Sequence, residues 1–110
     1  MGIPNAHLAT IAAEKLRDYL LNAEHERGGS KARLLLSLGY RRIEWDALER
    51  DLREQHLPLE PRLVKPNDFG VSYEIRGPIR TPSGRALVFR SIWQIDAGAE
   101  APRLITMFPD

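Results

Sequence analysis

The sequence predicts an α+β fold, with about three N-terminal helices packed on one face of a three- to four-stranded antiparallel meander sheet. Before residue 56, apolar side chains recur at the spacing of amphipathic helices. After residue 70, apolar and polar side chains alternate as they do in half-buried strands. The 110 residues, 43% hydrophobic and 28% charged, suffice for a single domain spanning residues 1–110.

Three helices are expected in the first half of the chain. Apolar residues at helical spacing predict the first over residues 10–21. The second covers residues 32–38, with Ser30 as its N-cap and Gly39 as the glycine that ends it. The third covers residues 44–55 and is stopped by the prolines that follow.

The second half has the pattern of an antiparallel meander. Residues 71–76 alternate as a half-buried strand, and Pro78 limits how far that strand can run inside the sheet. A TPSG turn leads into a long strand over residues 86–95. Residues 103–108 form the last strand, and residues 63–65 can add a short edge strand.

Composition narrows the class of protein. The absence of cysteine excludes disulfides and thiolate chemistry. It fits a cytoplasmic setting, and a cysteine-free exported effector is the alternative. No apolar run approaches the ~20 residues of a membrane span, so no membrane association is expected. The net charge of +1, from 16 basic and 15 acidic side chains, is low for a nonspecific polyanion binder. Any nucleic-acid contact therefore requires a local cluster of positive charge.

Neither a metal nor a cofactor is expected. The three histidines, His7, His25 and His56, lack the HExxH spacing of zinc hydrolases. The GGSK segment, residues 28–31, lacks the first glycine and the preceding strand of a nucleotide-binding loop.

The stretch HERGGSKARLLLSLGY, residues 25–40, places positive charge at the start of a helix, where the dipole disfavours cations. Backbone N–H groups at a helix start can bind an anion, which would compensate Lys31. His25, in the preceding loop, can take up or release a proton near neutral pH. Solvated surface side chains are the alternative, and local physics alone favours that interpretation.

Arg90 is the second unusual residue, because it lies in the middle of an otherwise apolar strand. It is either a solvent-facing charge on the open sheet face or an arginine suited to bidentate phosphate binding. Thr106 is either an ordinary strand threonine or a hydroxyl lining the same surface. Trp93 is expected in the core, whereas Tyr19 can be a core or a site residue.

The segments KLRDYLLNAEHERGGSKARLLLSLGY, SIWQI and PRLITMFP together resemble a small bacterial domain family of unknown function. That family is in turn loosely similar to ribonuclease toxin domains of the barnase, EndoU, colicin and RelE-like group. The resemblance implies a metal-independent site built from His, Lys, Arg and Thr or Tyr on the sheet and the adjoining helix. The positions that match are His25, Lys31, Trp93 and Thr106, and strand alternation adds Arg90.

The leading hypothesis is a toxin domain that cleaves RNA by attack of a 2′-hydroxyl on the adjacent phosphorus. His25 would be the base, Lys31 and Arg90 would stabilise the developing charge, and Thr106 would orient the phosphate. The partners implied are an RNA substrate and a cognate antitoxin or immunity protein.

Two alternatives are noncatalytic. One is a protein-binding module, or the partner protein of a toxin–antitoxin or immunity pair, whose open sheet face is the docking surface. The other is a structural domain that is fused to different modules in related proteins.

Overall fold

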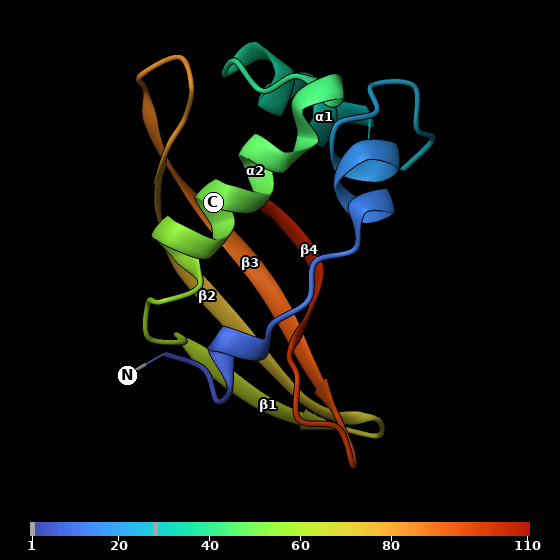
Figure 1. The fold of residues 1–110 in the computed structure, drawn as a ribbon, viewed down its shortest axis with the longest axis vertical. Coiled ribbons are helices and arrows are strands. Elements are labelled where there is room, and N and C mark those ends of the chain that lie inside the picture. The colour runs from blue at the N-terminus through green and yellow to red at the C-terminus, as the bar shows by residue number, and fades with distance from the viewer. Residues whose placement is uncertain (1, 28) are drawn as a thin grey trace.

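Helices precede a four-stranded antiparallel sheet in the computed structural model, which describes residues 2–27 and 29–110 (Figure 1). The strands lie in the order β1-β2-β3-β4, so that each pairs with its neighbour in sequence. The α+β class and the meander topology predicted from the sequence are confirmed.

The helical part is built from short segments. The α-helices are α1 (Gly29–Ser37) and α2 (Trp45–Asp51). Two π-helical segments, Lys15–Leu20 and Leu52–His56, and two 3₁₀ turns, Ala6–Leu8 and Arg42–Glu44, complete it.

The first predicted helix begins later than expected, because the backbone of Thr10 is used elsewhere. Its N–H donates to Pro102 at 2.8 Å, and its carbonyl accepts from Leu104 at 3.0 Å. Thr10 thereby forms a parallel bridge to Arg103 at the start of the last strand. A backbone held this way cannot also form the first helical turn.

The prediction for the second helix is wrong at its start and confirmed at its end. Ser30 lies inside α1, so the N-cap prediction is wrong. Gly39 has φ of +98° and ends the helix as predicted. Its N–H donates to Leu36 at 3.1 Å and that of Tyr40 donates to Leu35 at 3.3 Å, which is the bonding pattern of a Schellman motif. The third predicted helix is confirmed as a helical path from residue 42 to residue 56.

The sheet is dominated by one long hairpin. β2 (Gly70–Arg80) pairs with β3 (Ala86–Asp96) along its whole length. β1 (Leu63–Asn67) pairs with the first half of β2 only, as far as Glu74. Pro78, which has no ladder N–H to donate, therefore lies where β2 has become an edge strand. β4 (Arg103–Pro109) pairs with the other side of β3 and forms the opposite edge.

The two faces of the sheet differ in polarity. One face carries Ile75, Ile79, Phe89, Trp93 and Met107, all at most 1% exposed, against buried leucines of the helical segments. The core position of Trp93 is thus confirmed. The other face carries the alternate residues of the same strands and remains partly open.

A buried polar network fastens the helices to the central hairpin. His56 is fully buried, with Nε2 3.1 Å from the carbonyls of both Gly77 and Phe89. Two carbonyls can only accept, so Nε2 carries the hydrogen and Nδ1 accepts from the hydroxyl of Ser91 at 2.6 Å. The Ser91 oxygen in turn accepts from the Trp93 indole N–H at 2.9 Å. The histidine is therefore a structural residue.

We expect this network to make the stability of the protein depend on pH. Burial lowers the pKa of His56, although the two carbonyls favour the protonated ring. The unfolded chain thus binds a proton near pH ~6.5 that the folded protein does not. The free energy of unfolding should fall as the pH drops below that value, by up to ~1.4 kcal/mol per pH unit.

Chemical denaturation between neutral and mildly acidic pH measures this slope. His56→Gln should flatten it, and His7→Gln, at an exposed histidine, should leave it unchanged. An equal slope in wild type and His56→Gln would contradict the assignment.

Candidate functional site

Lys31 joins three segments of the chain at the outer edge of the sheet. It comes from the first turns of α1, and its ammonium lies 3.2 Å from the Thr106 hydroxyl of β4. The same ammonium lies 3.2 Å from the Tyr19 hydroxyl. It also lies 5.4 Å from the centre of the Tyr19 ring and 5.7 Å from that of Phe108. The helix lysine thus reaches around β4 to its open-face side chains.

His25 belongs to the same cluster through Tyr19. The two rings meet edge to face, with their centroids 4.8 Å apart. The Nδ1 atom of His25 accepts a hydrogen bond from the backbone N–H of Arg27 at 3.1 Å. In the neutral ring the hydrogen therefore lies on Nε2. We call Tyr19, His25, Lys31 and Thr106 the edge cluster.

Burial and the neighbouring groups change the pKa of the Tyr19 phenol. Partial burial raises the pKa of its phenol, but the hydrogen bond and the charge of Lys31 lower it. Thr106 and Lys15 act in the same direction as Lys31, and the net result is a pKa below the ordinary value. The Lys15 ammonium lies 5.5 Å from the centre of the ring. Two cations around one phenol also make this a favourable place for a bound anion.

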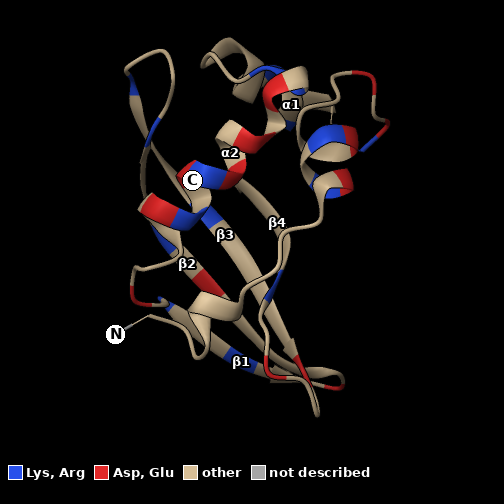
Figure 2. Cartoon of the chain, viewed as in Figure 1, with Lys and Arg blue, Asp and Glu red and all other residues tan. Residues whose placement is uncertain are grey.

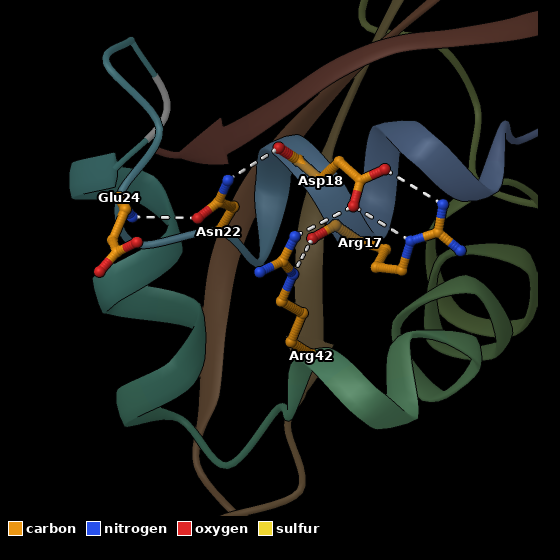
Figure 3. A network of polar contacts seen from close by, with 5 residues as sticks. All are labelled: Arg17, Asp18, Asn22, Glu24 and Arg42. Carbon is orange, nitrogen blue, oxygen red and sulfur yellow. Dashed lines mark hydrogen bonds and ion pairs between the residues drawn. The ribbon is translucent and has the colours of Figure 1, made fainter.

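A polar network beside the edge cluster holds the π-helical segment and the following loop in place (Figure 3). The Asp18 carboxylate accepts from Arg17 at 3.0 Å and from Arg42 at 3.1 Å. These hydrogen bonds and charges lower the pKa of Asp18. Asn22 donates to the Asp18 carbonyl at 3.3 Å and accepts from the Glu24 N–H at 3.1 Å. The segments carrying Tyr19 and His25 are therefore tied together without using either side chain.

An open pocket of about 430 Å³ adjoins the edge cluster, because two members of the cluster line it. Its lining residues come from the segment before α1: Ala12, Glu14, Lys15, Asp18, Tyr19 and His25. Tyr19 and His25 thus form both a wall of this pocket and the link to Lys31. A ligand in the pocket would contact the edge cluster.

Arg90 lies apart from the direct contacts of the edge cluster. It is on the open face, as the strand alternation predicts, and its register partner on β4 is Phe108. Its guanidinium donates to the Asp110 carboxylate at 2.7 Å. Phe108, which also contacts Lys31, therefore links the arginine to the edge cluster.

Tyr19 and Phe108 both contact Lys31, but the sequence did not establish either of them as a site residue. The helical spacing of Leu16 and Leu20 places Tyr19 beside the apolar stripe of its helix. The sequence alone could not distinguish this position from one in the core. Phe108 lies one residue before the end of β4 and has no local signal of function. Only the pairing of β4 with β3 places it between Lys31 and Arg90.

The described ranges, 2–27 and 29–110, contain no group of three or more His, Cys, Asp or Glu side chains that could hold a metal ion. The same ranges contain no helix of the length and apolarity needed to cross a membrane.

Comparison with known proteins assigns a family. The family described as "Domain of unknown function (DUF6883)" matches residues 2–110. The chain belongs to this family. No curated protein matches this DUF6883 chain.

The fold of the DUF6883 chain is similar to that of a solved structure. A chain of a "Contact-dependent growth inhibition toxin - immunity protein complex from Klebsiella pneumoniae 342" superposes with a TM-score of 0.67. The two sequences are 20% identical, and the match covers 93% of this chain and 100% of the other. At this identity the likeness is one of fold.

The contact between Lys31 and Tyr19 can be tested by titration. Lys31→Met removes the charge that lowers the pKa of Tyr19, and we expect that pKa to rise. Ultraviolet absorbance of tyrosinate measures the shift, and Tyr19→Phe identifies which transition belongs to Tyr19.

Lys65→Met is the matched control, because Lys65 is an exposed lysine on β1. It should leave the Tyr19 transition in place. An unchanged transition in Lys31→Met would show that Lys31 does not set the acidity of this phenol in solution.

Proposed function

We propose that this protein is the toxin domain of a toxin–immunity or toxin–antitoxin system and acts as a metal-independent endoribonuclease. The observation that carries the proposal is the edge cluster. It gathers a lysine ammonium, a phenol of lowered pKa, a threonine hydroxyl and an imidazole beside an open pocket. An imidazole or a phenol can transfer protons, and an ammonium and a hydroxyl can stabilise charge on a phosphoryl group.

The proposed reaction is a transesterification within the RNA strand. A base removes the proton of a ribose 2′-hydroxyl, and the oxygen attacks the adjacent phosphorus. The bond from phosphorus to the 5′-oxygen breaks, and that oxygen takes up a proton. The products are a 2′,3′-cyclic phosphate and a 5′-hydroxyl, so the step consumes no water and needs no oxidant or cofactor.

Lys31 and Thr106 would bind the reacting phosphate. The Lys31 ammonium is held by neutral hydroxyls at 3.2 Å, so its charge is available to an anion. It would stabilise the negative charge that builds on the phosphorane oxygens, and the Thr106 hydroxyl would orient the group.

His25 is the proposed base, and its tautomer sets a condition on that role. In the described conformation Nδ1 accepts the Arg27 N–H, so the neutral ring carries its hydrogen on Nε2. The ring must exchange tautomer before Nε2 can accept a proton. Tyr19, whose pKa is lowered, is the second group of the cluster that can accept one.

The comparisons support the toxin-system part of the proposal only at the level of fold. The solved complex contains both a toxin and an immunity protein, so the match is also compatible with the alternative of a partner protein. The edge cluster favours the toxin, because a partner that binds through its open sheet face has no need of an ionisable cluster at the edge.

We expect purified protein to cleave RNA in the presence of a chelator and to leave cyclic phosphate ends. Lys31→Ala and His25→Ala should each lower the cleavage rate by about 10²-fold or more. Tyr19→Phe separates the two candidate bases, because it should be nearly silent if His25 acts alone. Gel analysis of a defined RNA and expression in a test bacterium measure cleavage and toxicity.

His7→Gln and Lys65→Ala are the matched controls, with the same residue types at exposed positions outside the edge cluster. Both should keep wild-type cleavage. Intact RNA and normal growth with folded wild-type protein would refute the ribonuclease proposal. Recovery of a stoichiometric protein partner in that case would favour the noncatalytic alternative.

A further inference from the structure

Two arginines lie directly opposite each other on the open face of the sheet. Arg76 of β2 and Arg90 of β3 are register partners in the central hairpin. Side chains at such positions are close neighbours, and like charges there are destabilising unless an anion neutralises them. The side chains are 44% and 33% exposed, so solvent reaches both guanidinium groups.

The anion that neutralises the two arginines is the Asp110 carboxylate. Figure 2 shows how acidic and basic residues are distributed along the chain. One oxygen of Asp110 accepts from Nε of Arg76 at 2.8 Å and also from its terminal nitrogen, and the other accepts from Nε of Arg90 at 2.7 Å. These contacts lower the pKa of Asp110 to about 2. The pair thus already binds an oxyanion through charge-assisted hydrogen bonds, the mode by which arginines bind phosphate.

The position of the arginine pair relates it to the edge cluster. Phe108 is the register partner of Arg90 on β4, and its ring lies 5.7 Å from the Lys31 ammonium. One surface therefore presents a lysine, an aromatic ring and an arginine pair in succession. Cations interleaved with an aromatic ring are the arrangement that binds single-stranded nucleic acid, with phosphates on the cations and a base on the ring.

We propose that Arg76 and Arg90 form a phosphate subsite for an RNA strand whose scissile group lies at Lys31, and that Asp110 occupies this subsite in the free protein. This inference rests on the proposed ribonuclease function. An incoming phosphodiester displaces the carboxylate and takes over its hydrogen bonds. Asp110 is then an internal competitor that lowers the affinity for RNA until the strand engages.

The test uses the full chain and a single-stranded RNA oligonucleotide with 2′-O-methyl riboses, which cannot undergo 2′-hydroxyl attack. Asp110→Asn keeps the size of the side chain and removes its charge. If the carboxylate occupies the subsite about nine-tenths of the time, its removal should lower the dissociation constant about tenfold. Fluorescence anisotropy measures the change, and circular dichroism verifies that the variant is folded.

The higher RNA affinity of Asp110→Asn should depend on the arginine pair. Adding Arg90→Gln to Asp110→Asn should abolish it and reduce the dependence of log affinity on log salt by about 0.7. Asp96→Asn is the matched control, because it removes the same charge from another exposed carboxylate–arginine pair, with Arg103. It should change the dissociation constant by less than about twofold, since screening limits remote charges.

The two proposals fail separately. Cleavage of unmodified RNA together with an unchanged dissociation constant in Asp110→Asn would overturn the subsite and leave the ribonuclease standing. Equal gains from Asp110→Asn and Asp96→Asn would also overturn it, because net charge alone would then explain the affinity. Tighter binding without cleavage by any variant would support the anion subsite and refute the ribonuclease.

Discussion

The rest of the structure depends on the hydrogen bonds of one buried histidine. His56, at the end of the helical path, contacts the carbonyl of Gly77 on β2 and the carbonyl of Phe89 on β3. A neutral imidazole accepts at one nitrogen and donates at the other, so this arrangement fixes its tautomer as well as its place. These contacts hold both central strands against the helices and so fix the orientation of the sheet. The opposite face of the sheet is left partly open.

The candidate site lies at β4, the edge strand at which the helix-covered face of the sheet ends. β4 is an edge strand, so a lysine on α1 can reach the open-face threonine at 3.2 Å without crossing the core. Tyr19 completes the contact from the segment before α1. The site is therefore built at a boundary between two layers, where burial raises the pKa of the half-buried Tyr19 but its hydrogen bonds and the cations around it together outweigh that effect.

Local rules explain what the sequence could predict. Strand alternation located the open face and Arg90, and Gly39 marked the end of α1 because only a residue tolerant of positive φ fits there. The prediction for Thr10 was wrong because its backbone forms a bridge to Arg103, which is distant in sequence. The prediction for Ser30 was wrong because α1 already begins at Gly29. The meeting of Lys31 with Thr106, 75 positions apart, depends on tertiary packing that no periodicity encodes. The sequence contains no local signal for the buried role of His56, since its carbonyl partners come from two distant strands.

The near-neutral net charge does not by itself argue against binding of a polyanion, because what matters is how each cation is paired. Arg90 and Arg76 share one carboxylate, and Arg103 is paired with Asp96. The described contacts of Lys31 are instead with hydroxyls and aromatic faces, which are neutral and leave its field largely uncompensated. A chain with balanced charges can therefore still present one lysine whose described contacts are all neutral, while arginines elsewhere on the sheet are paired with carboxylates. The distribution of carboxylates, and not their number, decides where an anion binds.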